Sequence, residues 1–417
     1  MVGEGKGLSK LRVVLMLLTL FLTTMVTMSD MVITPIVNNL YETFAGEPEW
    51  LVGLCITGYS IIAIPAMTIA GHLCDRFNKK YVLIAGFALF TVSAIGSGTN
   101  FALSNIYVFL LCRVGIGIAW GCTVPGALSI IAQFFNSEDE HGKVVGWYNA
   151  SLNIVGAAIA FIAGFVAVTQ WTNAFIVYYA AVVVLVMLIV FLPSMPSSTP
   201  IKTSEDEGIA SAAPAAPKGW WKGLVPLTLQ ILALVLCNSV ALYLSSVYVA
   251  DAGLGDASFV GTITSIMTLV GVFGSLLFGT MYKKLGTFVY IPAAFVTAFA
   301  FIGMAFLPSV PMAAICMALQ GFMWPFFYCY YYTRCTEIVP EGKEGLATGV
   351  AGAAEGVSFA LAAPLFTTLM SVTHVESSLV IWPWFGYLAL LVAVLSLIGF
   401  LMKRGKSSKE VVEAAND

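Results

Sequence analysis

Three ionisable side chains lie inside long apolar stretches of this 417-residue sequence, and they are the first candidates for chemistry. Asp30 lies in the run TMSDMV, Arg113 in LLCRVG and Glu355 in GAAEGV. An ionised side chain at the centre of a membrane helix costs about 2.5–3.5 kcal/mol on insertion scales, so such residues usually bind protons, ions or charged solutes. We therefore predict that these three residues are proton-binding and proton-coupling groups.

Asp30 and Arg113 are expected to form an ion pair. Counting from Arg12, the rise of ~1.5 Å per residue places Asp30 roughly 27 Å along its helix. By the same rise Arg113 lies ~10 Å from the end of its own stretch, so the two depths are compatible. Two interpretations remain open: a switch that responds to a proton or a solute, and a static pair that holds two helices together.

Glu355 is expected near the middle of the membrane, ~15 Å from the nearer end of its stretch. No Lys or Arg lies at a similar depth in the second half of the sequence. An unpaired carboxyl there should bind a proton near neutral pH or attract a cationic solute. The alternative is a protonated Glu355 that is hydrogen-bonded to a neighbouring helix.

Membrane helices are the elements that must position these residues. The sequence is 59% hydrophobic and only 10% charged, and one span needs about 20 apolar residues. These properties predict an all-α polytopic membrane protein. We expect twelve spans at approximately 13–36, 50–70, 80–99, 104–134, 143–168, 173–192, 224–250, 258–281, 287–307, 311–333, 345–372 and 379–402.

The basic residues predict how these spans are oriented. With twelve spans, every Lys and Arg except Arg113 falls on one side, and the loops of the other side carry acidic residues. This bias predicts a cytoplasmic (plasma) membrane protein with both termini in the cytoplasm. The eight cysteines fall in spans or on the cytoplasmic side without a CxxC pair, so we expect neither extracellular disulfides nor a metal site.

The sequence divides into two related halves. Residues 193–222 are rich in Pro, Ser and Ala, which predicts a cytoplasmic linker between a bundle at 1–192 and a bundle at 223–417. The segment Gly71–Asn78 aligns with Gly279–Gly286 in the second half. Because Asn and Gly both tolerate left-handed backbone, we expect Asn78 and Gly286 to form the same turn.

Residues 71–80, GHLCDRFNKK, give the pattern G-x-L-x-D-R-x-x-K-K. This pattern resembles the loop between the second and third helices of the major facilitator superfamily of secondary transporters. The run RVGIG from Arg113 resembles the superfamily's fourth-span motif, and DMVITP from Asp30 resembles the first span of its bacterial twelve-span multidrug/proton antiporters. The fifth-span antiporter motif is incomplete, because Phe161 stands near the position expected for Pro.

The resemblance implies two six-helix bundles with a substrate site between them near the midplane. It also implies a cytoplasmic gate, in which Asp75 and Arg76 pair across the bundles when the protein opens outward. The gating residues expected from this loop are Gly71, Asp75, Arg76, Lys79 and Lys80.

Aromatic and amide side chains within the spans are candidates for substrate binding. Trp324 and Tyr328 lie four residues apart and so share a helix face, whereas we expect Phe326 and Phe327 to face lipid. An amide in a span can equally serve helix packing. The substrate-binding candidates are Trp120, Asn149, Asn153, Gln230, Asn238, Gln320, Trp324 and Tyr328.

Together these features predict a secondary transporter that exports a small organic solute by proton-coupled alternating access. The first alternative is uptake or exchange of an organic anion with Arg113 as the counter-charge, and a minor alternative is a receptor or scaffold that transports nothing. No H-E-x-x-H motif and no phosphate-binding G-x-x-x-x-G-K-[ST] loop is present, so we expect no catalytic residues, no enzyme and no ATP-driven pump. The expected partners are the solute and the bilayer. We expect a monomer that uses the proton gradient and binds no cofactor, metal or nucleic acid.

Overall fold

The structure, a computed structural model, describes residues 10–135, 138–193, 221–339 and 344–414. The predicted linker, 193–222, lies almost entirely outside the described residues. The described part of the chain is helical and contains no strand, and short 3-10 helices are labelled η. In chain order the elements are α1 (Lys10–Leu22), η1 (Thr23–Met25), η2 (Ser29–Val32), η3 (Thr34–Ile36), α2 (Val37–Thr43), α3 (Glu49–Thr57), α4 (Tyr59–Arg76), α5 (Lys79–Ser97), α6 (Asn100–Leu103), α7 (Ile106–Phe134), α8 (Glu138–Ala167), η4 (Trp171–Tyr179), α9 (Ala180–Phe191), α10 (Trp221–Tyr243), α11 (Ser245–Asp251), α12 (Ala257–Leu285), η5 (Gly286–Phe288), α13 (Tyr290–Phe306), α14 (Val310–Ile338), α15 (Glu344–Thr373) and α16 (Ser378–Ala414).

The helices agree with the predicted membrane spans. Among the described residues, ten helical segments are long and apolar enough to cross a membrane. A bent pair, Leu11–Met25 with Ser29–Thr43, adds an eleventh if it forms one broken span. The shorter apolar helix α13 falls in the predicted segment 287–307. The expected all-α polytopic fold is confirmed.

The first predicted span differs from expectation because its helix is broken. After α1 the chain forms three short 3-10 turns before α2, and the two parts are bent by 61°. Thr23 and Thr24 donate their hydroxyls to carbonyls three residues earlier, both at 2.6 Å, and Pro35 lies in η3. Side-chain bonds to nearby carbonyls and a proline both loosen the α-helical ladder. Asp30 therefore lies on the 3-10 turn η2, beyond the bend.

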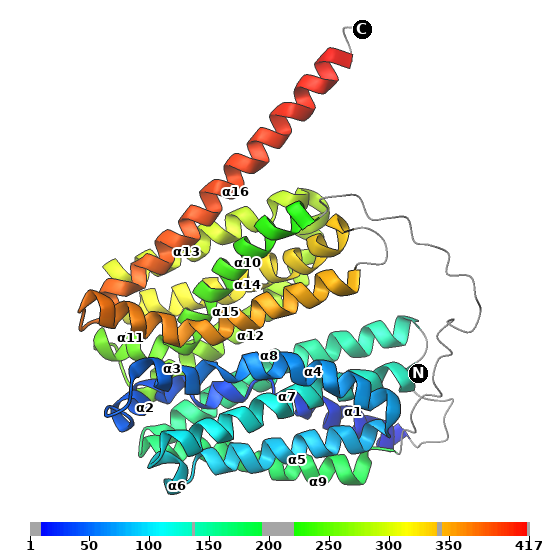
Figure 1. The fold of residues 1–417 in the computed structure, drawn as a ribbon, viewed down its shortest axis with the longest axis vertical. Helices are drawn as coiled ribbons and strands as arrows, with labels where there is room; N and C mark the ends of the chain where they lie inside the picture. The colour runs from blue at the N-terminus through cyan, green and yellow to red at the C-terminus, as the bar shows by residue number, and fades with distance from the viewer. Residues whose placement is uncertain (1–9, 136–137, 194–220, 340–343, 415–417) are drawn as a thin grey trace.

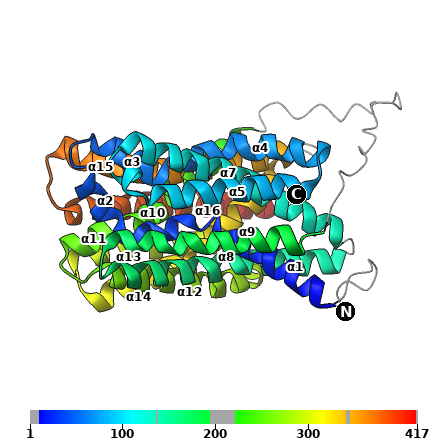
Figure 2. The same cartoon turned by 90° about the horizontal axis from the view of Figure 1, so that it is seen from below.

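The helices form two groups that lie side by side. In Figure 1, α1 to α9 make up the lower group and α10 to α16 the upper one. Figure 2, turned by 90°, shows that the helices of both groups run in nearly the same direction. α12 packs against α8, and α15 packs against α3 and α4, so these helices form the interface between the groups.

We name the two ends of the molecule by their charged residues. The basic end is where α4 meets α5 and α12 meets α13, and it carries Arg76, Lys79, Lys80, Lys283 and Lys284. The acidic end is where α2 meets α3 and α11 meets α12, and it carries Glu42, Glu47, Glu49, Asp251 and Asp256.

The two groups are joined toward the acidic end. In α11, the Ser246 hydroxyl donates to the carbonyl of Pro35 at 3.1 Å. α8 and α12 touch so closely that a methyl group added to Gly164 would lie 2.6 Å from the carbonyl oxygen of Ala257. Toward the basic end the groups diverge (Figure 1), and a methyl group added to Gly71 would meet no atom within 4 Å. The conformation is therefore closed at the acidic end.

The prediction that Asn78 and Gly286 form the same turn is wrong. Gly286 ends α12 with a φ of +53°, in the left-handed region. Asn78 has a φ of −63°, and its side chain accepts a hydrogen bond from the backbone N–H of Lys80 at 3.1 Å. An asparagine can cap the free N–H groups that start a helix, so the first-half loop passes directly into α5.

Candidate functional site

Asp30 and Arg113 form the ion pair expected from their depths. Nη2 of Arg113 lies 2.5 Å from Oδ1 of Asp30, and both side chains are almost completely buried. Asp30 comes from the turn η2 and Arg113 from the first third of α7. Because a buried pair is held in place by charge as well as by hydrogen bonds, it ties these two elements together.

Arg113 also holds the end of α3. Its Nε donates to the carbonyl of Cys55 at 2.8 Å, and its Nη2 donates to the carbonyl of Ile56 at 2.7 Å. These carbonyls belong to the last turn of α3, where carbonyls have no partner within the helix. The guanidinium therefore caps α3 while it neutralises Asp30.

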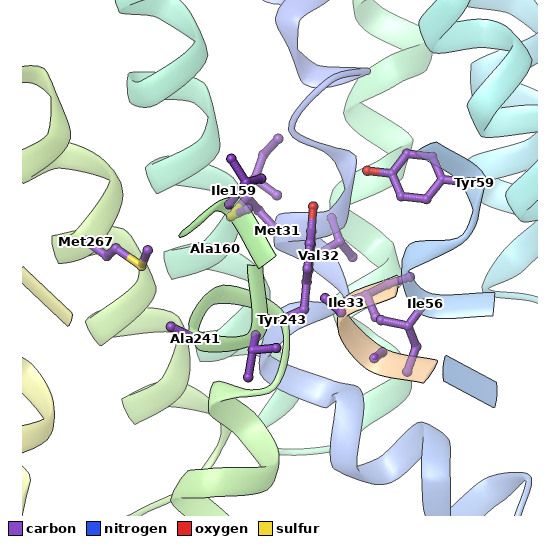
Figure 3. Close-up of a cluster of buried hydrophobic side chains, with 14 of the residues drawn as sticks. Met31, Val32, Ile33, Ile56, Tyr59, Ile159, Ala160, Ala241, Tyr243 and Met267 are labelled. Carbon is purple, nitrogen blue, oxygen red and sulfur yellow. The ribbon is translucent and has the colours of Figure 1, made fainter. Parts of the chain in front are cut away.

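Two tyrosines complete the surroundings of the carboxylate. Tyr59, in α4, donates its hydroxyl to Oδ2 of Asp30, and its ring centroid lies 4.5 Å from the guanidinium carbon of Arg113. Tyr243 comes from α10 of the other group, and its side chain interacts with Asp30 and with Tyr59. Figure 3 shows the hydroxyls of both tyrosines turned toward the same space. The carboxylate of the first group thus has a partner in the second group.

Sequence reasoning did not single out these tyrosines, nor Tyr178, which donates its hydroxyl to the carbonyl that precedes Asp30 at 2.9 Å. All three are buried. The available signal is that a tyrosine buried in an apolar segment needs a partner for its hydroxyl. That signal does not say which partner.

Glu355 lies in α15, and its partner is a hydroxyl on the neighbouring helix α14. Tyr332 donates to Oε2 of Glu355 at 2.8 Å. Among the described residues, no basic side chain pairs with this carboxyl. The rings of Tyr332 and Tyr328 lie 5.0 Å apart, and those of Tyr328 and Trp324 stack at 5.4 Å, which confirms the expected shared face. Phe359 lies one helical turn from Glu355, and its ring centroid is 6.2 Å from that of Trp324.

A row of aromatic side chains connects the two carboxyl sites. The ring centroids of Phe359 and Tyr243 lie 6.3 Å apart, and Tyr243 interacts with Tyr59. The ring centroids of Tyr59 and Trp120 lie 5.7 Å apart. The row brings together three of the predicted substrate-binding residues. We call it the aromatic row, and in spatial order it contains Trp120, Tyr59, Tyr243, Phe359, Trp324, Tyr328 and Tyr332.

The predicted amides have surroundings of their own. Asn149 is exposed, and its carbonyl accepts a hydrogen bond from Asn153 at 3.4 Å. Gln230 accepts from a tyrosine of α13 at 3.3 Å and lines a narrow, partly open pocket of about 10 Å³ in the second group. Asn238 and Gln320 are buried, and the amide nitrogen of the first and both amide atoms of the second have no partner within the described part of the chain.

The expectation that Phe326 and Phe327 face lipid is wrong. Their side chains are 5% and 0% exposed. Phe326 packs edge-on against Phe278 of α12, with ring centroids 6.3 Å apart. α14 lies between α12 and α13 and also contacts α10, so most of its circumference is covered by other helices.

The expected gating residues differ in burial and in their hydrogen-bond partners. Lys80 donates to two carbonyls at the end of α9, at 3.0 and 2.6 Å, so it caps a helix of its own group. Lys79 is buried, while Arg76 is exposed and Gly71 half-buried. The side chain of Asp75 lies outside the described structure. In this conformation the ends that would form the gate diverge.

Comparison with known proteins agrees with the fold. Residues 19–363 match the family model described as Major Facilitator Superfamily. The arabinose-proton symporter of Escherichia coli (strain K12) is 32% identical over 167 residues, 39% of this chain and 33% of the symporter. A probable sugar efflux transporter of Helicobacter pylori (strain ATCC 700392 / 26695) is 24% identical over 269 residues, 61% of this chain and 62% of the relative.

Solved structures resemble the whole chain. A bacterial homolog of the human lysosomal transporter Spinster, in an inward-facing and occupied conformation, matches with a TM-score of 0.72 at 17% identity. That match covers 94% of this chain and 98% of the other. By contrast, the alignment with the symporter spans only about a third of its length. The apolar helices and the family match identify a multi-pass membrane protein.

Proposed function

Because this chain belongs to the Major Facilitator Superfamily, we propose that it is a secondary transporter that exports a small organic solute in exchange for protons. Two bundles, 1–192 and 223–417, joined by the linker 193–222, open a central site alternately to either side of the cytoplasmic membrane. The basic end faces the cytoplasm, together with both termini, because basic loops stay on that side. The conformation described here is then the inward-facing one.

The surroundings of Glu355 are the observation that carries this proposal. Its side chain is half-buried, as are Trp324, Tyr328 and Tyr332 beside it, so the group borders accessible space between the helices. Tyr332 donates one hydrogen bond to it, and among the described side chains no cation neutralises it. A carboxyl in such a site has to bind either a proton or a positively charged ligand.

The proposed cycle is a competition at this carboxyl. The solute enters from the basic end, displaces the proton from Glu355 and rests against the stacked rings of Trp324 and Tyr328. After the bundles reverse their opening, a proton from outside displaces the solute. One proton therefore enters for each solute that leaves.

A solute with a protonated amine or another cationic group fits this site best. Anion exchange, the alternative from the sequence, is less well supported because Asp30 already neutralises Arg113. Sugars are the second candidate: two relatives are named for sugar transport, and stacked aromatic rings beside a carboxyl suit a polyhydroxy ring. The remaining alternative is a receptor that transports nothing. Such a receptor would show no counterflow of a labelled solute in proteoliposomes.

Proton release tests the proposal without knowledge of the natural solute. The purified protein in lightly buffered detergent solution, with a pH indicator, would receive tetraphenylphosphonium in one series and L-arabinose in another. We expect protons to be released on addition of tetraphenylphosphonium. Proteoliposomes with an imposed pH gradient would then show whether the same compound moves against its own gradient.

Glu355→Gln should abolish the proton release, because glutamine keeps the size of the side chain and cannot titrate. Glu376→Gln, at an exposed position on the acidic end, is the matched control and should release protons like the wild type. Release that persists in Glu355→Gln would place the exchanged proton elsewhere. Release caused by L-arabinose alone would favour the sugar.

A further inference from the structure

The face of α15 that meets the first helix group contains a proline. Pro364 lies inside α15, and a methyl group added to Gly53 of α3 would lie 2.9 Å from its nitrogen. The two backbones therefore approach closely at this point. One turn further along both helices, Thr57 donates its hydroxyl to the carbonyl of Ala360 at 3.0 Å. Both residues of this bond are buried.

The proline explains why this carbonyl is an acceptor for another helix. In a regular α-helix each carbonyl accepts the N–H of the residue four positions later. For Ala360 that residue is Pro364, which has no N–H. A buried carbonyl without a donor costs about as much free energy as a lost hydrogen bond. Thr57 of the first group thus supplies the donor that the backbone of α15 lacks.

The neighbouring contact between the groups is of a different kind. Ser60 of α4 donates its hydroxyl to the carbonyl of Gly356, also at 3.0 Å. Four residues after Gly356 stands Ala360, whose N–H serves this carbonyl within the regular helix. A carbonyl oxygen has two lone pairs, so Ser60 adds a second bond to an acceptor that already has a donor. Loss of the Ser60 hydroxyl would leave no carbonyl unsatisfied.

We propose that Thr57 latches the acidic end closed by donating to the carbonyl that Pro364 frees in α15. The carbonyls of Gly356 and Ala360 belong to the turn that follows Glu355. The latch therefore also fixes the position of Glu355 relative to the first group while the acidic end is closed. This inference rests on the proposed transport function and adds to it a residue that holds one of the two forms.

The latch acts on one form only. In the closed form the carbonyl of Ala360 is buried and depends on Thr57. When the acidic end opens, water enters between α3 and α15 and becomes the donor. Removing the hydroxyl of Thr57 therefore penalises the closed form alone and shifts the population toward the open form. A general loss of stability would penalise both forms and leave their ratio unchanged.

The distance between the two helix groups at the acidic end is the test. Spin labels on cysteines introduced at the exposed positions Glu49 and Glu376 report this distance by pulsed electron resonance. The full-length protein is measured in liposomes without solute. Its three half-buried cysteines are first replaced by alanine, so that they do not take up label; they are Cys112, Cys122 and Cys329. The quantity compared between variants is the ratio of separated to closed distances.

Thr57→Val should raise this ratio about tenfold, because it leaves a buried carbonyl unsatisfied in the closed form. Thr57→Ser keeps the hydroxyl and should restore the ratio to within about twofold of the wild type. Thr264→Val is the matched control and should leave the ratio unchanged. Thr264 is a buried threonine of the interface helix α12, and its hydroxyl donates to two carbonyls of its own helix, at 2.8 and 3.2 Å.

Pro364→Ala tests whether the proline is the reason for the latch. Alanine returns an N–H to the carbonyl of Ala360, so the hydroxyl of Thr57 becomes a second donor there. In the Pro364→Ala background, Thr57→Val should change the ratio by about threefold or less. Ser60→Ala in the native background should have a similarly small effect, because its acceptor keeps the N–H of the helix.

An unchanged ratio in Thr57→Val would overturn the proposal, and so would a ratio that Thr57→Ser does not restore. An effect of Thr57→Val that keeps its full size in the Pro364→Ala background would also overturn it. The comparisons at Thr57 need no change at Pro364, so they decide the matter if the Pro364→Ala protein folds poorly. Because no solute is present, these outcomes do not depend on whether the export proposed above is correct.

Discussion

Replacing Arg113 alone should damage the fold more than replacing Arg113 and Asp30 together. Arg113→Gln leaves a buried carboxylate without its counter-charge and leaves two carbonyls at the end of α3 without their donors. Adding Asp30→Asn removes the stranded charge but not the loss at the carbonyls. The double variant therefore tests what the charge itself contributes.

The magnitudes follow from these contacts. Removing one partner of a buried pair costs about 3–5 kcal/mol, and each unsatisfied buried carbonyl costs about 1 kcal/mol or more. We expect Arg113→Gln to lose about 5 kcal/mol and the double variant about 2 kcal/mol, on the same bookkeeping. The difference of about 3 kcal/mol between these two variants is the cost of the stranded charge, more than a hundredfold in an equilibrium constant.

Thermal unfolding in detergent micelles measures the order of stabilities. Wild type should have the highest midpoint, the double variant the next and Arg113→Gln the lowest. Lowering the pH should partly restore Arg113→Gln, because a proton on Asp30 removes the stranded charge, and it should not restore the double variant. If the double variant is no more stable than Arg113→Gln, then the pair is not held by charge and the reasoning fails.

Three further substitutions test other parts of the fold. Gly321→Ala should prevent proper folding, because the added methyl would lie 1.9 Å from the carbonyl oxygen of Met267 and force α14 away from α12. The monodisperse fraction on gel filtration measures how much protein folds. The control, Gly399→Ala, adds a methyl that meets no atom within 4 Å and should behave like wild type. Lys80→Met removes a cation from the end of α9 and should lower the free energy of unfolding by about 0.5–1 kcal/mol. If the transport rate falls while the unfolding midpoint stays unchanged, the result would instead favour a gating role for Lys80. Asp251→Ala removes the carboxylate that accepts from the first N–H of α16 at 2.5 Å and should lower the unfolding midpoint by the equivalent of about 1 kcal/mol; an unchanged midpoint would show that water replaces this cap.

The sequence predicts what depends on spacing along a helix and misses what depends on how helices are rotated. Asp30 and Arg113 could be paired because the rise per residue sets their depths. Phe326 and Phe327 were misplaced because their helix is apolar on every side, so no face is marked for lipid or for the interior. Tyr243 could not be assigned to Asp30, since the two residues meet only across the two helix groups.

The break in the first span shows a second limit. Its threonines and Pro35 are visible in the sequence, yet each of them is tolerated in regular membrane helices as well. Whether they interrupt a helix depends on neighbours that can satisfy the freed backbone groups. The amides predicted to bind substrate show the same limit, because Asn238 and Gln320 lie in predicted spans but are buried among the helices of the second group.

Three of the hydroxyls that join the two groups each have a second acceptor nearby in their own half of the chain. Thr57 lies 3.2 Å from the carbonyl of Gly53 as well as 3.0 Å from that of Ala360. Ser60 also reaches the carbonyl of Thr57 at 2.9 Å, and Ser265 reaches the carbonyl of Gly261 at 2.6 Å besides its partner in α8 at 2.8 Å.

When the groups separate, each of these hydroxyls can give its proton entirely to the carbonyl of its own helix. None of these three donors is stranded in the membrane, so breaking their contacts does not incur the usual penalty of an unsatisfied polar group. Breaking these three contacts therefore adds little to the free energy of the open form. A proton gradient of one pH unit is worth about 1.4 kcal/mol, or a tenfold change in the ratio of the two forms, and little of it is then spent on stranded hydroxyls.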